Sequence, residues 1–512
     1  MTKDLMLFSR AAAAAIALLI APVATAYQTL NPAVRDLIQR NKIFDASIGV
    51  CAIDVETGEM LVSINADRRF IPASNMKLLT SGTALAILGD DFVFRTEFIR
   101  AGDRLIVKGS GDPALGDPVI LEQMNPALTA DELLEKVGEA LAKAGIERIT
   151  EIIIDDRVFD RQRVHPDWPI DQLNRRYCAE VDGVSFHNNV LAVFPRPSVS
   201  GPGHSPSAPF QPDADWIEIE IRARTVSKGS NTTWMTREPS LNRFTMLGDV
   251  RERARTPVHV TLTKPGLFFG RLLADRLAKQ GIDTSPPSGE RFSNVRLVGE
   301  HEALPEGELV AVITTRIEHI LRRCNTDSYN LYAEALAKTT GHRLAGEPGS
   351  WENGSAAVKM TLAERLGPSA VASVDVADGS GMSRKNKITP AVMAAWLRNL
   401  QSDPDIADAF LASLARVGEG TLRKRFRTVR IDNTVQAKSG LLSEVRTLSG
   451  YLTNERTGRR IVFSILVNEL QEGVNTRGAR QFHEEVVAEL DEWLTATVES
   501  FAEVETDSRY GG

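Results

Sequence analysis

The chain has 512 residues, of which 43% are hydrophobic and 25% are charged. This length is too great for one simple hydrophobic core, and the composition is ordinary for a globular protein, so we expect two or three domains. The formal net charge of −7 argues against binding to nucleic acid or to an anionic membrane surface.

The first 26 residues form a segment of their own. Lys3 and Arg10 precede the apolar run AAAAAIALLIAPV. Ala24 and Ala26 then place small side chains at the two positions that a signal peptidase recognises. The run is shorter than the ~20 apolar residues that a membrane-spanning helix needs. We therefore expect a secretory signal peptide, cleaved after about Ala26, and a protein exported to the periplasm with no membrane anchor.

The next elements are a predicted β-hairpin and a helix. Residues 47–55 and 59–66 have strand patterns on either side of an ETG turn. A helix is predicted to begin near Ser74 and to end at Gly89.

The pattern changes to strands after the first helix. From about 94 to 309, short apolar strand-like runs dominate, and one helix is predicted at 131–145. Residues 196–215 are rich in Pro, Ser and Gly and are predicted to form a long loop.

Long helices return after about residue 310, at 317–325, 330–341, 356–367 and 388–403. Three strands follow, at 435–440, 447–454 and 459–468, and then a helix at 480–501. We expect the early hairpin and these late strands to form one antiparallel sheet. The predicted fold class is α+β, with a sheet-and-helix domain from 27–93 and 310–497, a strand-rich insertion at 94–309 that forms two small nested domains, and a frayed acidic tail at 498–512.

Cysteine and histidine residues give no sign of a metal site. Cys51, Cys178 and Cys324 lie far apart, so at most one disulfide can form, and a pair between Cys51 and Cys178 is left open. The eight histidines form no HxxxH or HExxH motif. We expect neither a metal nor a cofactor.

Ser74 and Lys77 form the only Ser-x-x-Lys motif of the chain. Side chains three residues apart on a helix are neighbours, about 5–6 Å between Cβ atoms, so the amine can reach the hydroxyl and act as a base. The free N–H groups at the start of the helix can stabilise an oxyanion. The alternative interpretation is a serine cap beside a solvated lysine.

Two later motifs carry further hydroxyl and amine groups. Ser328 and Asn330 lie between two predicted helices, where they can point into a cleft. Lys438 and Ser439 begin a strand and can hold a carboxylate, while Gly440 allows another backbone to approach closely. Each has a structural alternative, namely a helix cap, a solvated strand end and a β-bulge. Ser-x-x-Lys, Ser-x-Asn and a Lys-Thr-Gly-type strand, in this order, are the signature of penicillin-binding proteins and class A β-lactamases.

The chain resembles the D-alanyl-D-alanine carboxypeptidase/endopeptidases of the low-molecular-mass, class C penicillin-binding proteins. RRFIPASNMKLLTS, GSGDPAL, IIIDDRVFD, CNTDSYNLYAEAL, DGSGMSRKN and AKSG all resemble blocks of this family. The resemblance implies a penicillin-binding, β-lactamase/transpeptidase-like domain with a large insertion that class A β-lactamases lack. Two departures are Lys-Ser-Gly in place of Lys-Thr-Gly, and Tyr329 in the middle motif.

The resemblance also implies a role for each residue of the three motifs. Ser74 attacks the carbonyl of the D-Ala-D-Ala bond of a peptidoglycan stem peptide, and Lys77 accepts its proton. Ser328 and Asn330 pass the proton to the leaving amine and orient the peptide. The terminal carboxylate and the oxyanion are then held by Lys438, Ser439, Gly440 and the backbone N–H groups of Ser74 and Leu441. β-Lactams are expected to act as covalent inhibitors.

Two more residues are implied in substrate recognition. The resemblance places Asp155 and Arg384 near the site, where one negative and one positive group suit the zwitterionic end of diaminopimelate. The alternative is that Asp155 caps a strand and Arg384 makes a surface ion pair.

Two other functions remain open from the sequence. A β-lactamase needs rapid deacylation, and no residue is evident for that step. A non-catalytic protein that binds peptidoglycan through the insertion has no need of Ser74, Lys77 and Lys438, so the hydrolase is the preferred interpretation.

Overall fold

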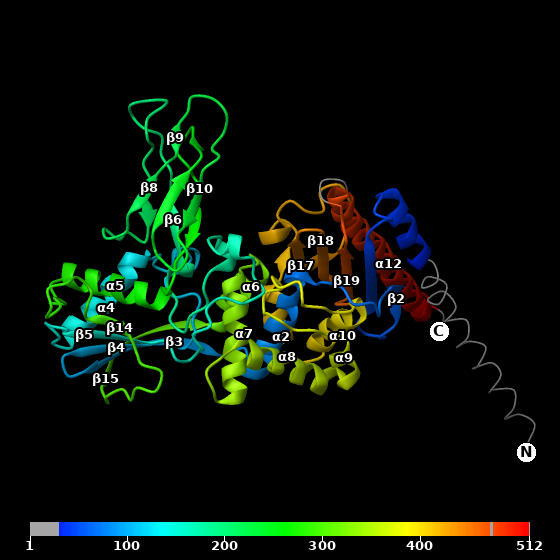
Figure 1. Cartoon of the computed structure of the whole chain (residues 1–512). Coiled ribbons are helices and arrows are strands. Elements are labelled where there is room, and N and C mark those ends of the chain that lie inside the picture. Colours follow the sequence, from blue (N-terminus) through cyan, green and yellow to red (C-terminus); the bar gives the residue numbers. More distant parts are fainter. Residues whose placement is uncertain (1–29, 472–474, 511–512) are drawn as a thin grey trace, which may run out of the picture. The chain divides into compact units, whose positions relative to one another are not determined.

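The computed structural model of the chain describes residues 30–471 and 475–510 (Figure 1). The predicted signal peptide lies outside these residues. The chain divides into two compact units, and both are discontinuous in sequence. The first consists of Met1–Gly82, Asn325–Ser328 and Val358–Gly512, and the second of Thr83–Cys324 and Tyr329–Ala357. These two units do not coincide with the domains predicted from the sequence, whose boundaries stay a prediction.

The first unit is built on a six-stranded antiparallel sheet. Its β1 is buried along its whole length, which explains the nearly continuous apolar sequence SIGVCAID. The early hairpin and the late strands share this sheet, as predicted. Its strands, in spatial order, are β16 (Ala415–Arg416), β17 (Thr434–Leu442), β18 (Val445–Thr453), β19 (Arg460–Asn468), β1 (Ser47–Asp54) and β2 (Met60–Ile64).

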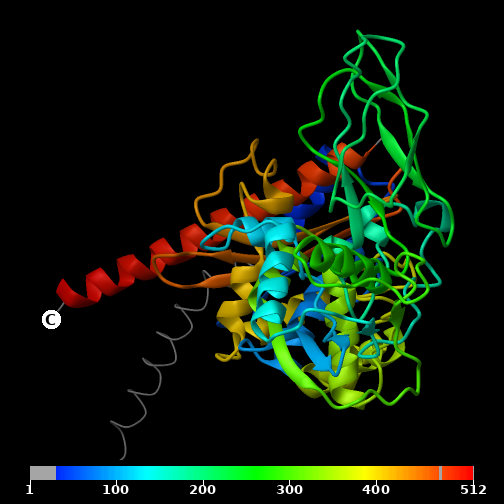
Figure 2. The same cartoon turned by 90° about the vertical axis from the view of Figure 1, so that its left-hand side faces the viewer.

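Helices cover both faces of this sheet. Phe482, Val486 and Leu490 of α12 (Thr476–Tyr510), which includes the helix predicted at 480–501, pack in one cluster with Leu448 of β18. On the opposite face, the hydroxyl of Tyr451 donates to a carbonyl of α10 (Pro390–Gln401) at 2.8 Å. Figure 2 shows α12 along its length. Its backbone is helical through Tyr510, well beyond the start of the predicted frayed tail.

The remaining elements of the first unit are helices. Two of them, α2 (Met76–Leu88) and α8 (Trp351–Leu366), extend into the second unit. The helix at 30–40 contributes to the same cluster as α12. The others are η1 (Ala73–Asn75), α9 (Pro368–Ala372), α11 (Ala407–Ser413) and η5 (Gly420–Leu422).

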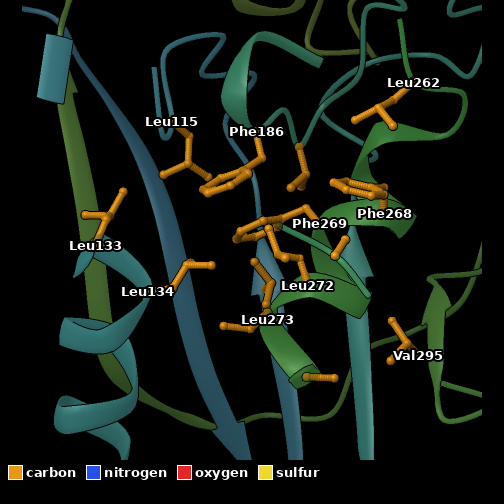
Figure 3. Packing of buried hydrophobic residues seen from close by; sticks show 14 of the residues in the cluster. Leu115, Leu133, Leu134, Phe186, Leu262, Phe268, Phe269, Leu272, Leu273 and Val295 are labelled. Atoms are coloured by element: carbon orange, nitrogen blue, oxygen red, sulfur yellow. The ribbon is translucent and has the colours of Figure 1, made fainter. Parts of the chain in front are cut away.

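The second unit contains a five-stranded mixed sheet in the order β14-β5-β4-β3-β15. Helix α4 (Ala130–Lys143) has a capping box at Thr129 and Glu132, and α5 (Pro265–Lys279) begins with a proline. Leucines of both helices pack in one cluster with Phe186 (Figure 3). The strands are β3 (Val93–Ala101), β4 (Arg104–Lys108), β5 (Glu151–Asp155), β14 (Val295–Leu297) and β15 (Glu308–Arg316).

The second unit also contains several short strands joined by long irregular segments, in line with the strand-rich character predicted for 94–309. They form three small sheets, in the orders β10-β11-β8, β12-β9 and β13-β6-β7. The strands are β6 (Val190–Val193), β7 (Phe210–Gln211), β8 (Ile219–Ile221), β9 (Arg224–Thr225), β10 (Trp234–Arg237), β11 (Phe244–Leu247), β12 (Asp249–Val250) and β13 (Val258–Thr261). The remaining helices are α3 (Pro118–Glu122), η2 (Ile170–Gln172), η3 (Arg176–Cys178), η4 (His187–Asn189), α6 (Ile317–Asn325) and α7 (Asn330–Ala345).

Candidate active site

Ser74 lies in a tight turn rather than in the first turn of a regular helix. The turn is the 3-10 helix η1, and α2 follows it directly. Ala73 adopts a left-handed backbone with φ of +46°, a conformation that costs free energy for a residue with a side chain. Gly381 approaches this turn so closely that a Cβ there would lie 1.8 Å from the Ala73 carbonyl oxygen. The turn is therefore shaped by a neighbouring loop as well as by its own sequence.

Lys77 lies beside Ser74, as the spacing of the motif predicts. Its Nζ is 3.2 Å from Ser74 Oγ and 2.8 Å from the carbonyl oxygen of Ser380, to which it donates. The side chain is fully buried. Burial next to a hydroxyl and a carbonyl holds the amine in one position, which suits a group that exchanges a proton with Ser74.

The loop that contacts Lys77 is held rigid by Asp378. Its carboxylate accepts from the backbone N–H groups of Gly381 at 2.8 Å and Ser383 at 2.6 Å, and from the Asn386 amide at 2.8 Å. The sequence predicts no link between this loop and Lys77. No local pattern reveals this link, because it joins segments that lie far apart in the chain.

Ser328 and Lys438 form a second hydroxyl–amine pair. Lys438 Nζ donates to Ser328 Oγ at 2.7 Å and to the carbonyl of Ser439 at 2.9 Å. Lys438 is fully buried on β17, and Ser328 has a left-handed backbone with φ of +62°. A non-glycine residue keeps such a strained backbone only where the surrounding structure stabilises it, so Ser328 is fixed by its neighbours.

Gly440 lies where β17 passes closest to the Ser74 turn. A Cβ at this position would lie 3.0 Å from the backbone nitrogen of Ser74, 3.0 Å from the Pro72 carbonyl oxygen and 2.1 Å from Thr447 Oγ1. Only glycine fits such an approach without displacing its neighbours. Leu441 follows on the same strand with its side chain 66% exposed.

Asn75 anchors the Ser74 turn to the sheet. Its amide nitrogen donates to the Lys438 carbonyl at 3.0 Å and to Thr447 Oγ1 at 2.8 Å, and its oxygen accepts from the Ser449 N–H at 3.0 Å. Asn75 is fully buried, so these bonds replace water completely. Sequence reasoning missed this residue, because its partners on β17 and β18 lie far along the chain.

The remaining predicted residues have structural partners of their own. Arg384 donates to the Ser443 carbonyl at 2.9 Å and pairs with Glu444 at 3.1 Å. In the second unit, the Asn330 amide donates to the Tyr177 carbonyl at 2.8 Å.

Asp155, at the end of β5 in the second unit, accepts two hydrogen bonds from the Arg157 guanidinium, at 2.8 and 2.9 Å.

The predicted site residues fall in both units. Within the first unit, the structure brings together Ser74, Lys77, Ser328 and the Lys438–Leu441 strand. Asn330 and Asp155 belong to the second unit.

The described residues show neither a disulfide nor a metal-binding cluster. Cys51, Cys178 and Cys324 are all buried thiols, and burial raises the pKa of the Cys51 thiol to about 12. Among the described residues there is no cluster of three or more metal-ligating His, Cys, Asp or Glu side chains. The same part of the chain contains no helix with the length and apolar character that crossing a membrane requires.

Known proteins resemble the chain over most of its length. A curated D-alanyl-D-alanine carboxypeptidase from Actinomadura sp. (strain R39) is 30% identical over 437 residues, which cover 82% of this chain and 77% of that protein. The D-alanyl-D-alanine carboxypeptidase DacB of Haemophilus influenzae is 23% identical over 442 residues, covering 84% of this chain and 86% of that protein.

A solved structure shares the fold. The crystal structure of penicillin binding protein 4 (dacB) from Haemophilus influenzae superposes with a TM-score of 0.72 at 22% identity, covering 89% of this chain and 99% of that chain. The predicted α+β, penicillin-binding fold class is therefore confirmed. Residues 30–490 match the model of the D-Ala-D-Ala carboxypeptidase 3 (S13) family. The chain therefore belongs to the D-Ala-D-Ala carboxypeptidase 3 (S13) family of peptidases, as its resemblance to class C penicillin-binding proteins predicts.

Proposed function

We propose that this protein is a serine-type hydrolase that cleaves the D-Ala-D-Ala bond of peptidoglycan stem peptides in the periplasm. The observation that carries the proposal is the buried Lys77 amine 3.2 Å from Ser74 Oγ, together with the Lys438–Ser328 pair on the strand whose Gly440 borders Ser74. Two amine–hydroxyl pairs in one unit supply the groups that a nucleophilic attack and a proton transfer need.

The reaction proceeds in two stages. Ser74 Oγ attacks the carbonyl carbon of the scissile bond as Lys77 takes the hydroxyl proton, and the leaving amine receives a proton through the Ser328 hydroxyl. The result is an ester of the peptide with Ser74. Water then attacks this acyl-enzyme and releases the shortened peptide, and Ser74 regains its proton. The backbone N–H groups of Ser74 and Leu441 hold the oxyanion in both stages.

Substrate binding forms part of the same proposal. Lys438 and Ser439 hold the terminal carboxylate, and Asn330 orients the peptide. Asp155 and Arg384 stay predicted contacts for diaminopimelate, although each already has an ion-pair partner in its own unit. The cross-link between D-Ala and diaminopimelate is a second substrate that would make the enzyme an endopeptidase.

β-Lactams are the proposed covalent inhibitors, since they mimic the D-Ala-D-Ala end and acylate the same serine. A complex of the Haemophilus influenzae penicillin binding protein 4 with a β-lactam supports this.

The test compares the mature protein with its Ser74→Ala variant on purified cross-linked muropeptides, with products read by mass. We expect the wild type to release D-Ala, or to convert dimers to monomers, and the variant to do neither. Wild-type protein that is folded but inert on both substrates would favour the non-catalytic peptidoglycan-binding alternative. Rapid turnover of penicillin, in place of a long-lived adduct on Ser74, would favour the β-lactamase alternative.

A further inference from the structure

Strand β17 has two faces with different neighbours. Gly440 faces the Ser74 turn, and the Lys438 side chain, on the same face of the strand, reaches Ser328. Alternation along a strand turns the Ser439 side chain to the other face. There its cross-strand partner, Leu448, packs in the hydrophobic cluster that includes α12. The strand that borders Ser74 therefore presents Ser439 to the α12 side.

A cavity of about 390 Å³ borders this stretch of β17 and extends to Gly440 and Thr447, next to the Ser74 turn. Ser439 and Leu441 also line it, together with Thr476, the first helical residue of α12. The first turn of a helix offers backbone N–H groups and the positive end of the helix dipole. Strand, helix start and the segment after η5 thus enclose one cavity within the first unit.

The side chains around the cavity are strongly basic. Arg425, Arg446, Arg477 and Arg480 all line it, and its described lining residues include no acid. Glu484, just behind, accepts from Arg425 and, at 3.2 Å, from Arg480. One carboxylate against four guanidiniums leaves an excess of positive charge, and guanidinium groups bind carboxylate and phosphate oxygens in pairs.

Two buried polar groups at the cavity have no hydrogen-bond partner within the part of the chain that the structure describes. His483 is 1% exposed, yet neither of its ring nitrogens has a partner among the described residues. The buried hydroxyl of Thr421 lacks one as well. Leaving such groups unsatisfied is costly, and native proteins do so rarely unless a ligand, ion or water completes them.

We propose that this cavity is a binding site for a small oxyanion, a carboxylate or a phosphate group, held by the arginine guanidiniums, the His483 ring and the Thr421 hydroxyl. Burial and the charges of Arg425 and Arg446 hold the pKa of His483 well below its usual range. The ring is therefore neutral in the empty cavity and offers one N–H donor. A bound anion accepts from that donor and offsets the surrounding positive charge.

Two sources can supply this oxyanion. One is the anionic end of a peptide substrate that reaches past Ser439, and this possibility rests on the proposed function. The other is a separate small anion that binds whether or not a peptide is present. The binding site itself does not depend on which source fills it.

The first experiment titrates the mature protein, labelled with ¹⁵N-histidine, with inorganic phosphate, using chloride at equal ionic strength as the reference. We expect a saturable shift of the His483 ring signals, which the His483→Gln variant identifies by their loss. Arg477→Ala removes an exposed guanidinium of the cavity and should weaken phosphate binding roughly tenfold.

Arg427→Ala is the matched control, because Arg427 is exposed on the same segment as Arg425 and does not line the cavity. It should bind phosphate like the wild type. The absence of a saturable shift in the wild type, or equal affinities in the Arg477 and Arg427 variants, would overturn the proposal.

A second experiment distinguishes the sources by following hydrolysis of a D-Ala-D-Ala peptide at increasing phosphate. Competitive inhibition that is lost in Arg477→Ala would identify the carboxylate of the substrate as the occupant. Unchanged hydrolysis at saturating phosphate would identify a separate anion. A protein that binds phosphate but hydrolyses nothing would refute the proposed function and leave the anion site intact.

Discussion

At the scale of single residues, Asp112 links burial to the pH dependence of stability. Its carboxylate is 3% exposed and accepts from Thr315 Oγ1 at 2.6 Å and from the Ala114 N–H at 2.8 Å. Burial outweighs these bonds and raises the pKa of Asp112 from 3.8 to about 6. The folded state therefore binds this proton more tightly than the unfolded chain. Its contribution to stability is complete below about pH 3.8 and is lost as the pH rises through about 6.

Asp112→Asn should remove this part of the pH dependence. We expect the wild type to lose up to about 3 kcal/mol more of its free energy of unfolding than the variant as the pH rises through this window. Urea unfolding at several pH values measures the difference. Asp103→Asn, at an exposed position, should keep the wild-type slope. Identical slopes for the two variants would contradict the role assigned to Asp112.

At the scale of elements, the docking of η1 on β17 and β18 depends on Asn75. Asn75→Ala leaves the Lys438 carbonyl and the Ser449 N–H without these bonds, which should cost about 1–3 kcal/mol of the free energy of unfolding. Because the turn carries Ser74, acylation by a fluorescent penicillin should also become slower. Urea unfolding and stopped-flow fluorescence measure the two effects. Lower stability with an unchanged acylation rate would show that Asn75 does not position the nucleophile.

The elements also show how far the sequence predicts the fold. Apolar periodicity predicts the hairpin, the late strands and the helix at 480–501, since each of these patterns is local. The shared sheet followed from pairing the two ends of the chain. The sequence predicts an end of α12 near 501, because acidic residues follow, but the backbone continues as a helix to Tyr510.

The site was predictable where it depends on spacing within one element. Ser74 in η1 and Lys77 in the first turn of α2 are three residues apart, and this short spacing brings their side chains together. Asn75 and Ser449 are 374 residues apart, and no pattern in either segment indicates their contact. The carbonyl of Ser380 beside Lys77 was missed for the same reason.

At the scale of the whole molecule, the two units have separate hydrophobic clusters. Leu490 is fully buried in the cluster of the first unit, and Leu273 in that of the second. Each leucine-to-alanine change should cost about 2–5 kcal/mol of the free energy of unfolding. Because the clusters have no residue in common, the cost in the double variant should equal the sum within about 0.5 kcal/mol. Denaturant unfolding of the four proteins tests this, and a larger departure would show that the two clusters are coupled.

The sheet of the first unit has a consequence for the order in which the parts of the candidate site become available. Strand β1, near the start, pairs with β19, near the end, so the central part of the sheet cannot close until β19 has been synthesised. Ser74 leaves the ribosome early, but Lys438 and the strand that carries Gly440 are among the last parts to follow. A nascent or truncated chain thus contains the serine without the groups that position it. Under the proposed function, Ser74 therefore gains its partners on β17 only after nearly the whole chain has been made.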